Sequence, residues 1–237
     1  MVKVYLVGGF VRDLQMNVIL GTPLNKKSDV DYAVEAGSYE EMKEWLVREK
    51  HADIKVEAPQ FFTIRALVNK EVSDYTLCRK ESNYTDGRHP DVVTIGTIYD
   101  DLARRDFTMN AMAIDCDTGE LLDPYNGIED IRNLRIVCVG NASQRMTEDY
   151  LRMLRALRFS VTLGFSLDAN ILEILHHQIS ICKLIETVSQ ERIREELTKM
   201  FKYNTSFTLM MFDKFPSLRD NVFINTDLWL KPTFERR

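Results

Sequence analysis

The chain has 237 residues, of which 45% are hydrophobic and 28% charged, and its net charge is −5. These values describe an ordinary soluble globular protein with room for one large domain or two smaller ones. The absence of a long apolar run excludes a membrane span, and the negative charge argues against a surface broadly coated by nucleic acid, although a local basic groove stays compatible with it.

The beginning of the chain and its cysteines predict a cytoplasmic protein. Residues 2–7 are an apolar strand with no preceding signal peptide. Cys78, Cys116, Cys138 and Cys182 are scattered without Cys-x-x-Cys spacing. We interpret them as reduced thiols of an intracellular protein, not as a zinc site or a disulfide framework.

The first part of the chain alternates strand and helix signals. After the strand at 2–7, the amphipathic segment 11–20 predicts a helix that ends near Gly21 and Pro23, and 30–34 predicts a second strand.

A helix over 39–50 has Ser38 as its expected N-cap. Residues 61–68 and 72–78 predict a strand pair around the turn 69–70. Polar residues 81–90 predict a loop.

The chain then changes character. We expect residues 101–114 to be helical at least in part and 121–127 to form a turn. After residues 131–139 the segments 147–159, 168–177 and 189–202 show helical periodicity. We therefore predict a boundary near Gly140, with a mixed α/β head over 1–139 and a helical domain over 140–237.

The first chemical signal is a glycine pair followed by two aspartates. Gly8 and Gly9 stand between a strand and a helix start, where backbone N–H groups can hold a phosphate. Asp29 and Asp31 alternate on the next strand and so share one face. Two carboxylates facing a phosphate cradle suit Mg²⁺ bound to a nucleoside triphosphate, although each feature alone is common in purely structural settings.

A two-metal site needs a third carboxylate. Asp74, on the expected strand 72–78, is the best candidate, with Glu71 and Glu81 as alternatives. A lone aspartate on a strand is more often a surface residue, so Asp74 ranks first only because the first pair requires a partner.

Two further clusters combine arginine with carboxylates. Residues 104–111 include Arg105 and Asp106, which suit phosphate and a ribose hydroxyl, or a helix cap with surface arginines. Residues 148–159 place Asp149 and Arg152 three positions apart, so we expect them to adjoin on one helix face.

That pair could offer hydrogen-bond acceptors and donors to a nucleobase edge. Arg155 and Arg158 follow Arg152 at the same three-residue spacing. The alternative is an ordinary ion pair on a solvated helix.

Together these segments resemble the class II nucleotidyltransferases, which include CCA-adding enzymes and bacterial poly(A) polymerases. The resemblance covers about residues 5–202. It rests on five ordered motifs at 7–13, 29–31, 104–108, 123–127 and 148–152, and on residues 189–193, which look like the family's last neck motif.

The resemblance implies a polymerase-β-like head with a small mixed sheet and helices, followed by an all-helical neck. It implies that Asp29 and Asp31 bind catalytic Mg²⁺ and that Asp74 matches the third acidic position. The remaining implied nucleotide contacts are Gly8, Gly9, Arg12, Arg105, Asp106, Asp149, Arg152, Arg155 and Arg158. The loop 81–90 matches the flexible loop linked in the family to the switch from CTP to ATP.

The expected activity is template-independent addition of CCA to tRNA 3′ ends from CTP and ATP. A bacterial-type poly(A) polymerase, a partial enzyme that adds CC or A, and a catalytically silent RNA- or nucleotide-binding module are the alternatives. Two departures from the family are a somewhat long spacer between Asp13 and Asp29 and a chain that stops soon after the neck. A compact member, a fragment, or a homo-oligomer or partner that helps to grip RNA would each account for the second departure.

Overall fold

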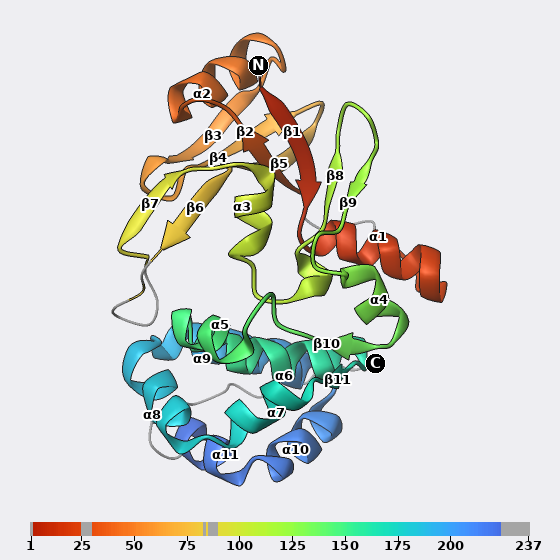
Figure 1. Cartoon of the computed structure of the whole chain (residues 1–237), viewed down its shortest axis with the longest axis vertical. Coiled ribbons are helices and arrows are strands. Elements are labelled where there is room, and N and C mark those ends of the chain that lie inside the picture. Colours follow the sequence, from red (N-terminus) through yellow and green to blue (C-terminus); the bar gives the residue numbers. More distant parts are fainter. Residues whose placement is uncertain (1, 25–29, 83, 85–89, 224–237) are drawn as a thin grey trace. The chain divides into compact units, whose positions relative to one another are not determined.

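The computed structural model of the chain describes residues 2–24, 30–82, 84 and 90–223 (Figure 1). The chain divides into two compact units, one formed by residues 1–83 with 91–133 and the other by 84–90 with 134–237. The boundary near Gly140 stays a prediction. Within the described residues no helix is both long and apolar enough to cross a membrane.

A seven-stranded mixed sheet forms the centre of the first unit, as the resemblance implies. Its strands, in spatial order, are β3 (Asp53–Ala58), β4 (Thr63–Val68), β5 (Glu71–Leu77), β2 (Asp31–Glu35), β1 (Lys3–Val7), β8 (Ala113–Asp115) and β9 (Leu121–Leu122). The β2–β5 pair is parallel and the other neighbouring strands of this sheet are antiparallel.

Short helices and a separate hairpin accompany this sheet. The helices are α1 (Gly9–Leu20), α2 (Tyr39–Arg48), α3 (Ile98–Ala103) and α4 (Gly127–Arg132), with 3₁₀ turns η1 (Pro59–Phe61) and η2 (Thr108–Asn110). The hairpin pairs β6 (Arg79–Ser82) with β7 (Val92–Ile95).

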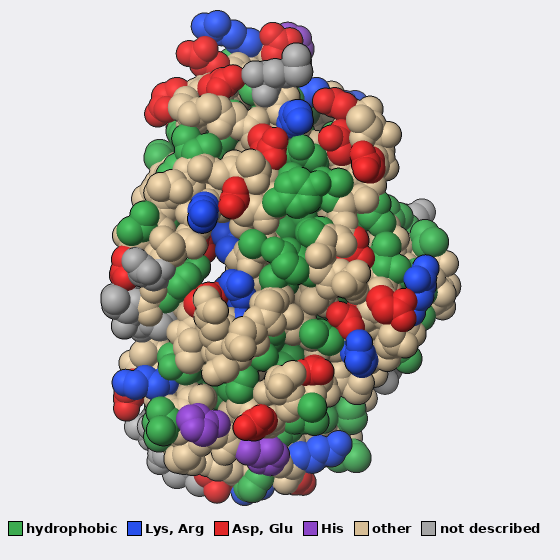
Figure 2. All heavy atoms as spheres, viewed as in Figure 1, with side chains coloured by type: hydrophobic (Ala, Val, Ile, Leu, Met, Phe, Trp, Pro, Cys, Tyr) green, Lys and Arg blue, Asp and Glu red, His purple; other side chains and the backbone are tan. Residues whose placement is uncertain are grey.

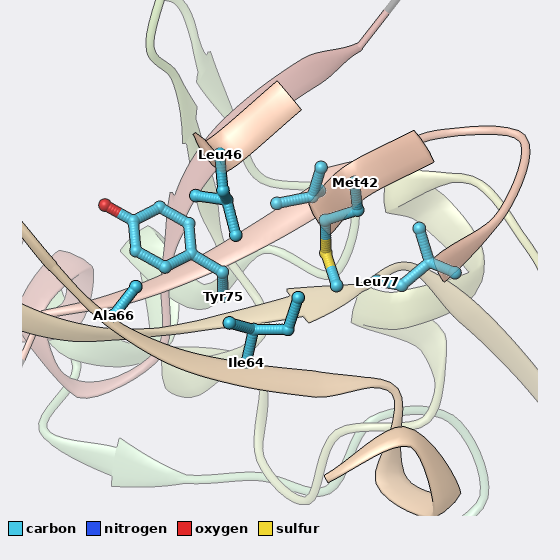
Figure 3. Packing of buried hydrophobic residues seen from close by; sticks show 7 residues of the cluster. Met42, Leu46, Ile64, Ala66, Tyr75 and Leu77 are labelled. Atoms are coloured by element: carbon cyan, nitrogen blue, oxygen red, sulfur yellow. The ribbon is translucent and has the colours of Figure 1, made fainter. Parts of the chain in front are cut away.

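One face of the sheet is buried beneath α2. Met42 and Leu46 of this helix are fully buried and pack toward Ile64, Tyr75 and Leu77 of the strands (Figure 3). The expected cap is confirmed, because the Ser38 hydroxyl accepts a hydrogen bond from the Glu41 N–H. Since successive strand residues alternate in direction, Asp74 and Asp31 lie on the opposite face.

Several sequence predictions of the first unit need correction. β3 escaped prediction because this edge strand has a mostly exposed pattern instead of a regular alternation. Residues 81 and 82 are not loop, since they belong to β6 and pair with Val93 and Val92. The expectation that 101–114 is helical in part is confirmed, because α3 extends to Ala103 and η2 is a 3₁₀ turn, although α3 begins before this segment and the end of the segment forms β8.

The second unit is mainly helical. Its helices are α5 (Ala142–Glu148), α6 (Leu151–Leu163), α7 (Ala169–His176), α8 (Gln178–Thr187), α9 (Gln190–Tyr203), α10 (Thr205–Lys214) and α11 (Pro216–Phe223). A short parallel pair, β10 (Arg135–Ile136) with β11 (Ser166–Leu167), accompanies them, so the unit is not strictly all-helical.

The continuous helix predicted over 147–159 is wrong. Asp149 has an extended backbone with φ −151°, and its side chain accepts a hydrogen bond from the Leu151 N–H at the start of α6. A short acidic side chain that binds backbone in this way favours a helix boundary over a helix interior. The segment is therefore two helices, α5 and α6, joined at Asp149 and Tyr150.

Candidate active site

The glycine pair forms the turn that joins β1 to α1. Gly8 has φ +74° and ψ −140°, a conformation that glycine adopts readily and L side chains rarely do. A Cβ placed there would lie 3.4 Å from Nη1 of Arg105 and 3.6 Å from Oδ2 of Asp31. Residues from three separate segments therefore meet beside this turn.

The start of α1 is suited to an anion. Gly8 makes no side-chain cap, and the first turn of this 12-residue helix contains no acidic residue. Its first N–H groups lack partners within the helix, and the helix dipole adds partial positive charge there. A phosphate at this position would also meet Arg12, whose Nη2 lies 3.5 Å from a Cβ placed on Gly9.

Asp31 and Asp74 are brought together by the parallel pairing of β2 with β5. They are direct register partners, so both side chains leave the same face of the sheet. The Asp74 carboxylate is held in a bidentate ion pair by Arg65 of β4, with N–O distances of 2.7 Å to both oxygens. Asp29 lies outside the described residues.

These carboxylates fit a hard divalent cation. Carboxylate oxygens are the donors that Mg²⁺ prefers, and two of them stand in register on adjacent strands. Among the described residues no cluster of three or more His, Cys, Asp or Glu side chains forms a metal site. A metal at Asp74 would compete with Arg65 for the same oxygens.

Arg12 and Asp106 are linked through the buried side chain of Asn110. Arg12 donates from Nη1 to Oδ1 of Asn110 at 3.0 Å, and Asn110 donates from Nδ2 to Oδ1 of Asp106, also at 3.0 Å. Arg12 also binds the neighbouring Asp13. Arg105 donates to the Asn110 carbonyl at 3.4 Å.

A buried carboxylate, Asp101, holds the two arginines of the second cluster. Arg104 and Arg105 bind opposite oxygens of Asp101 at 2.5 Å and 2.9 Å. Burial alone would raise the pKa of Asp101, but the guanidinium groups of Arg105 and Arg104 outweigh it and hold that pKa below its ordinary value. This contact holds Arg105, whose Nη1 lies beside Gly8, in place.

The 3₁₀ turn η2 that carries Asn110 is anchored by α4. A Cβ on Gly127 would overlap the carbonyl oxygen of Thr108, so only glycine permits this close approach. The Thr108 hydroxyl donates to buried Asp130 at 2.8 Å, and Asp123 caps the helix by accepting from the Gly127 N–H. The turn predicted over 121–127 is therefore restricted to 123–127, since Leu121 and Leu122 form β9, and its contacts support η2.

In the second unit, Asp149 and Arg152 each have a different charged partner. Oδ2 of Asp149 accepts from Arg192 of α9 at 2.9 Å, while Arg152 donates to Glu148 at 2.9 Å. Glu148 is buried and also binds Arg145. Burial lowers the pKa of Arg145, although the negative charge of Glu148 acts in the opposite direction. The sequence predicts that Asp149 and Arg152 adjoin on one helix face. Instead, each belongs to a separate ion pair at the α5–α6 junction.

The other two arginines pack along α6. Arg158 binds buried Glu196 of α9 at 2.5 Å, and its guanidinium lies 4.0 Å from the centre of the Phe159 ring. Arg155 lies 5.6 Å from the same ring. Arg158 therefore joins α6 to α9, and nucleotide contact by either arginine stays a prediction.

Charged side chains are interspersed on the surface. Figure 2 shows Lys and Arg side chains mixed with Asp and Glu over the visible face, without one broad basic patch there. This distribution agrees with the net charge of −5.

Sequence reasoning missed four supporting residues, although three of them had a visible signal. Asp101 precedes Arg104 and Arg105 by three and four positions, and Glu148 precedes Arg152 by four, which are the spacings of ion pairs on a helix. Arg65 stands opposite Asp74 in the hairpin predicted around Asn69 and Lys70, whereas Asn110 gave no signal because its partner Arg12 is 98 positions away.

Comparison with known proteins gives a consistent assignment. Residues 4–137 match the family model described as the poly A polymerase head domain, and residues 164–213 match one described as a probable RNA and SrmB-binding site of polymerase A. The chain is 39% identical over 199 residues to a CCA-adding enzyme of Enterococcus faecalis, which covers 84% of this chain and 45% of the relative. A CCA-adding enzyme of Listeria innocua is 42% identical over 201 residues, covering 84% and 47%.

Solved structures show the same architecture. The CCA-adding enzyme of Bacillus stearothermophilus in complex with CTP matches with a TM-score of 0.72 and 32% identity, over 89% of this chain and 47% of that chain. The Thermotoga maritima CCA-adding enzyme complexed with tRNA matches with a TM-score of 0.72 and 27% identity, over 94% and 48%. The chain spans about half the length of the curated relatives it matches.

Proposed function

The chain belongs to the family of the poly A polymerase head domain, and on that premise we propose that it is a nucleotidyltransferase that extends an RNA 3′ end without a template. The observation that carries the proposal is the meeting of Asp31 Oδ2 and Arg105 Nη1 beside the Gly8 turn. A carboxylate for a metal and a cation for a phosphate there face the start of α1, as phosphoryl transfer requires.

In the proposed reaction, the RNA 3′ hydroxyl attacks the α-phosphorus of a nucleoside triphosphate. The new bond joins the 3′ oxygen to that phosphorus, and the bond to the departing pyrophosphate breaks in line with it. The triphosphate is held by Arg12, Arg105 and the N–H groups at the start of α1. Asp106 accepts a hydrogen bond from a ribose hydroxyl.

Asp29, Asp31 and Asp74 would hold a divalent cation, which we propose to be Mg²⁺. When bound, the ion supplies Lewis-acid activation of the attacking hydroxyl and neutralises charge on the leaving group. Arg65 would have to share or release Asp74 for that residue to act as a ligand.

We propose tRNA as the RNA and CCA as the added sequence, with Asp149 and Arg152 of the second unit selecting the base. The support is that curated relatives from several bacteria are named CCA-adding enzymes and that structures of similar chains contain CTP, an ATP analogue and tRNA. The matched family models, described by poly A polymerase, keep a poly(A) polymerase as the second candidate.

Incubation with a tRNA that ends at its discriminator base separates these candidates. CTP alone should add two nucleotides, and CTP with ATP should add three. Long tails from ATP alone would indicate a poly(A) polymerase, whereas a stop after CC or addition of a single A would indicate a partial enzyme. No incorporation with any nucleotide would contradict the proposal.

A further inference from the structure

Asn110 occupies the junction between the groups assigned to the triphosphate and the group assigned to the ribose. The residue is only 6% exposed, and its carboxamide uses its oxygen and its nitrogen toward different partners. The oxygen accepts from Arg12 and the nitrogen donates to Asp106, each at 3.0 Å.

The backbone of Asn110 adds a third connection, because its carbonyl oxygen accepts from Nη1 of Arg105 at 3.4 Å. That same nitrogen of Arg105 is the atom beside Gly8. One residue thus contacts the side chains of Arg12, Arg105 and Asp106.

The position of Asn110 is itself fixed from behind. It closes the turn η2, where its N–H donates to the carbonyl oxygen of Phe107 at 2.9 Å, and η2 is held to α4 by the Thr108–Asp130 hydrogen bond. A buried carboxamide with both ends bonded on an anchored turn has little freedom to change its orientation. It therefore offers Arg12 and Asp106 hydrogen-bonding groups at fixed positions, beside the bonds that Arg12 makes to Asp13 and Asp106 makes to the Phe107 N–H.

We propose that Asn110 is a positioning residue that aligns the ribose acceptor Asp106 with the triphosphate cation Arg12, and so makes the site prefer ribonucleotides over deoxyribonucleotides. The inference rests on the proposed function. A carboxamide suits this junction because it offers an acceptor to a guanidinium and a donor to a carboxylate, which neither Asp nor a hydrophobic side chain can do at once.

The Asn110→Asp variant separates the two connections. Its carboxylate still accepts from Arg12, but it has no donor for Asp106 and instead places a second negative charge beside it. The Asn110→Ala variant removes both connections. Asn133→Asp is the matched control, because Asn133 lies at the end of α4 and its exposed amide donates only to Glu129 among the hydrogen bonds seen here.

The test measures the dissociation constants of CTP and dCTP for the full chain with a divalent cation, together with thermal unfolding. The wild-type chain and N133D should bind CTP more tightly than dCTP. N110D should weaken the binding of CTP by about tenfold while the binding of dCTP changes little. Its ratio of the two dissociation constants should therefore match that of Asp106→Ala. N110A should weaken both ligands.

A folded N110D variant that keeps the wild-type ratio would overturn the inference and leave the proposed function intact. A wild-type chain that binds neither nucleotide would overturn both. If N110D does not fold, the N110A variant decides, since unchanged binding of both nucleotides would contradict the positioning role.

Discussion

Asp101 is a buried carboxylate that holds two arginines of the candidate site. It is 1% exposed and its two oxygens are bound by Arg104 and Arg105. Its depressed pKa means that the carboxylate stabilises the folded chain at neutral pH. That contribution is fully present above the unfolded pKa of about 4 and is lost as pH falls through the lower folded value.

We expect Asp101→Asn to lower the free energy of unfolding by about 3 kcal/mol, because it leaves two guanidinium groups without their buried partner. Thermal or denaturant unfolding at pH 7 measures this. Asp53→Asn is the control, since Asp53 pairs with Lys55 on the surface and should cost less than about 1 kcal/mol. Equal losses in both variants would contradict the account of Asp101.

Asp149 allows a test of base selection. CTP and ATP both present an exocyclic amine beside a ring nitrogen, whereas UTP and GTP carry a carbonyl in place of the amine. A carboxylate that faces this carbonyl loses a hydrogen bond worth about 1–3 kcal/mol. Asp149→Ala should therefore raise kcat/KM for UTP and GTP relative to CTP and ATP by about tenfold.

The measurement compares all four nucleotides on one RNA primer, with Asp220→Ala as a control because Asp220 pairs with Arg219 on α11. A lower rate with unchanged selectivity would mean that Asp149 acts only through its ion pair with Arg192.

At the scale of elements, the turn between β1 and α1 gives a matched pair of substitutions. Gly8 needs a positive φ of 74°, whereas Gly9 does not have a positive φ. Gly8→Ala should cost about 1–3 kcal/mol of stability through backbone strain. Gly9→Ala should change stability by less than about 1 kcal/mol, since its new Cβ would make an ordinary 3.5 Å contact with Arg12.

Thermal unfolding of the two variants, measured side by side, decides the matter. If Gly9→Ala were the more damaging substitution, the turn would not have the conformation described here.

Local patterns predicted the elements that carry the site better than they predicted the contacts within it. The strand–glycine–helix order, the Ser38 cap and the β4–β5 hairpin around Asn69 and Lys70 are confirmed, because each depends on neighbouring residues. The pairing of Asp31 with Asp74 depends on strand register, and the break at Asp149 depends on its side chain binding the Leu151 N–H. Periodicity carries no information on either.

The same limit explains why the partner of Arg12 was missed. Asn110 reaches Arg12 across 98 positions of the chain. A long-range contact of this kind follows from the tertiary fold, so periodicity and spacing in a single sequence do not reveal it.

At the scale of the whole molecule, the chain contains a mixed α/β unit with the candidate active site and a helical unit. Together they span about half the length of the relatives named CCA-adding enzymes. The chemistry is assigned within the first unit, from residues that converge on one glycine turn.

In the proposed function, the carboxylate of Asp31 serves metal-dependent nucleotidyl transfer. The most direct measurement is incorporation of labelled CTP into a tRNA that ends at its discriminator base, for the wild type, Asp31→Asn and the control Asp53→Asn. The account predicts incorporation that requires a divalent cation, is retained in D53N, and falls at least about a hundredfold in a D31N variant that stays folded. Near-normal incorporation by D31N would contradict it.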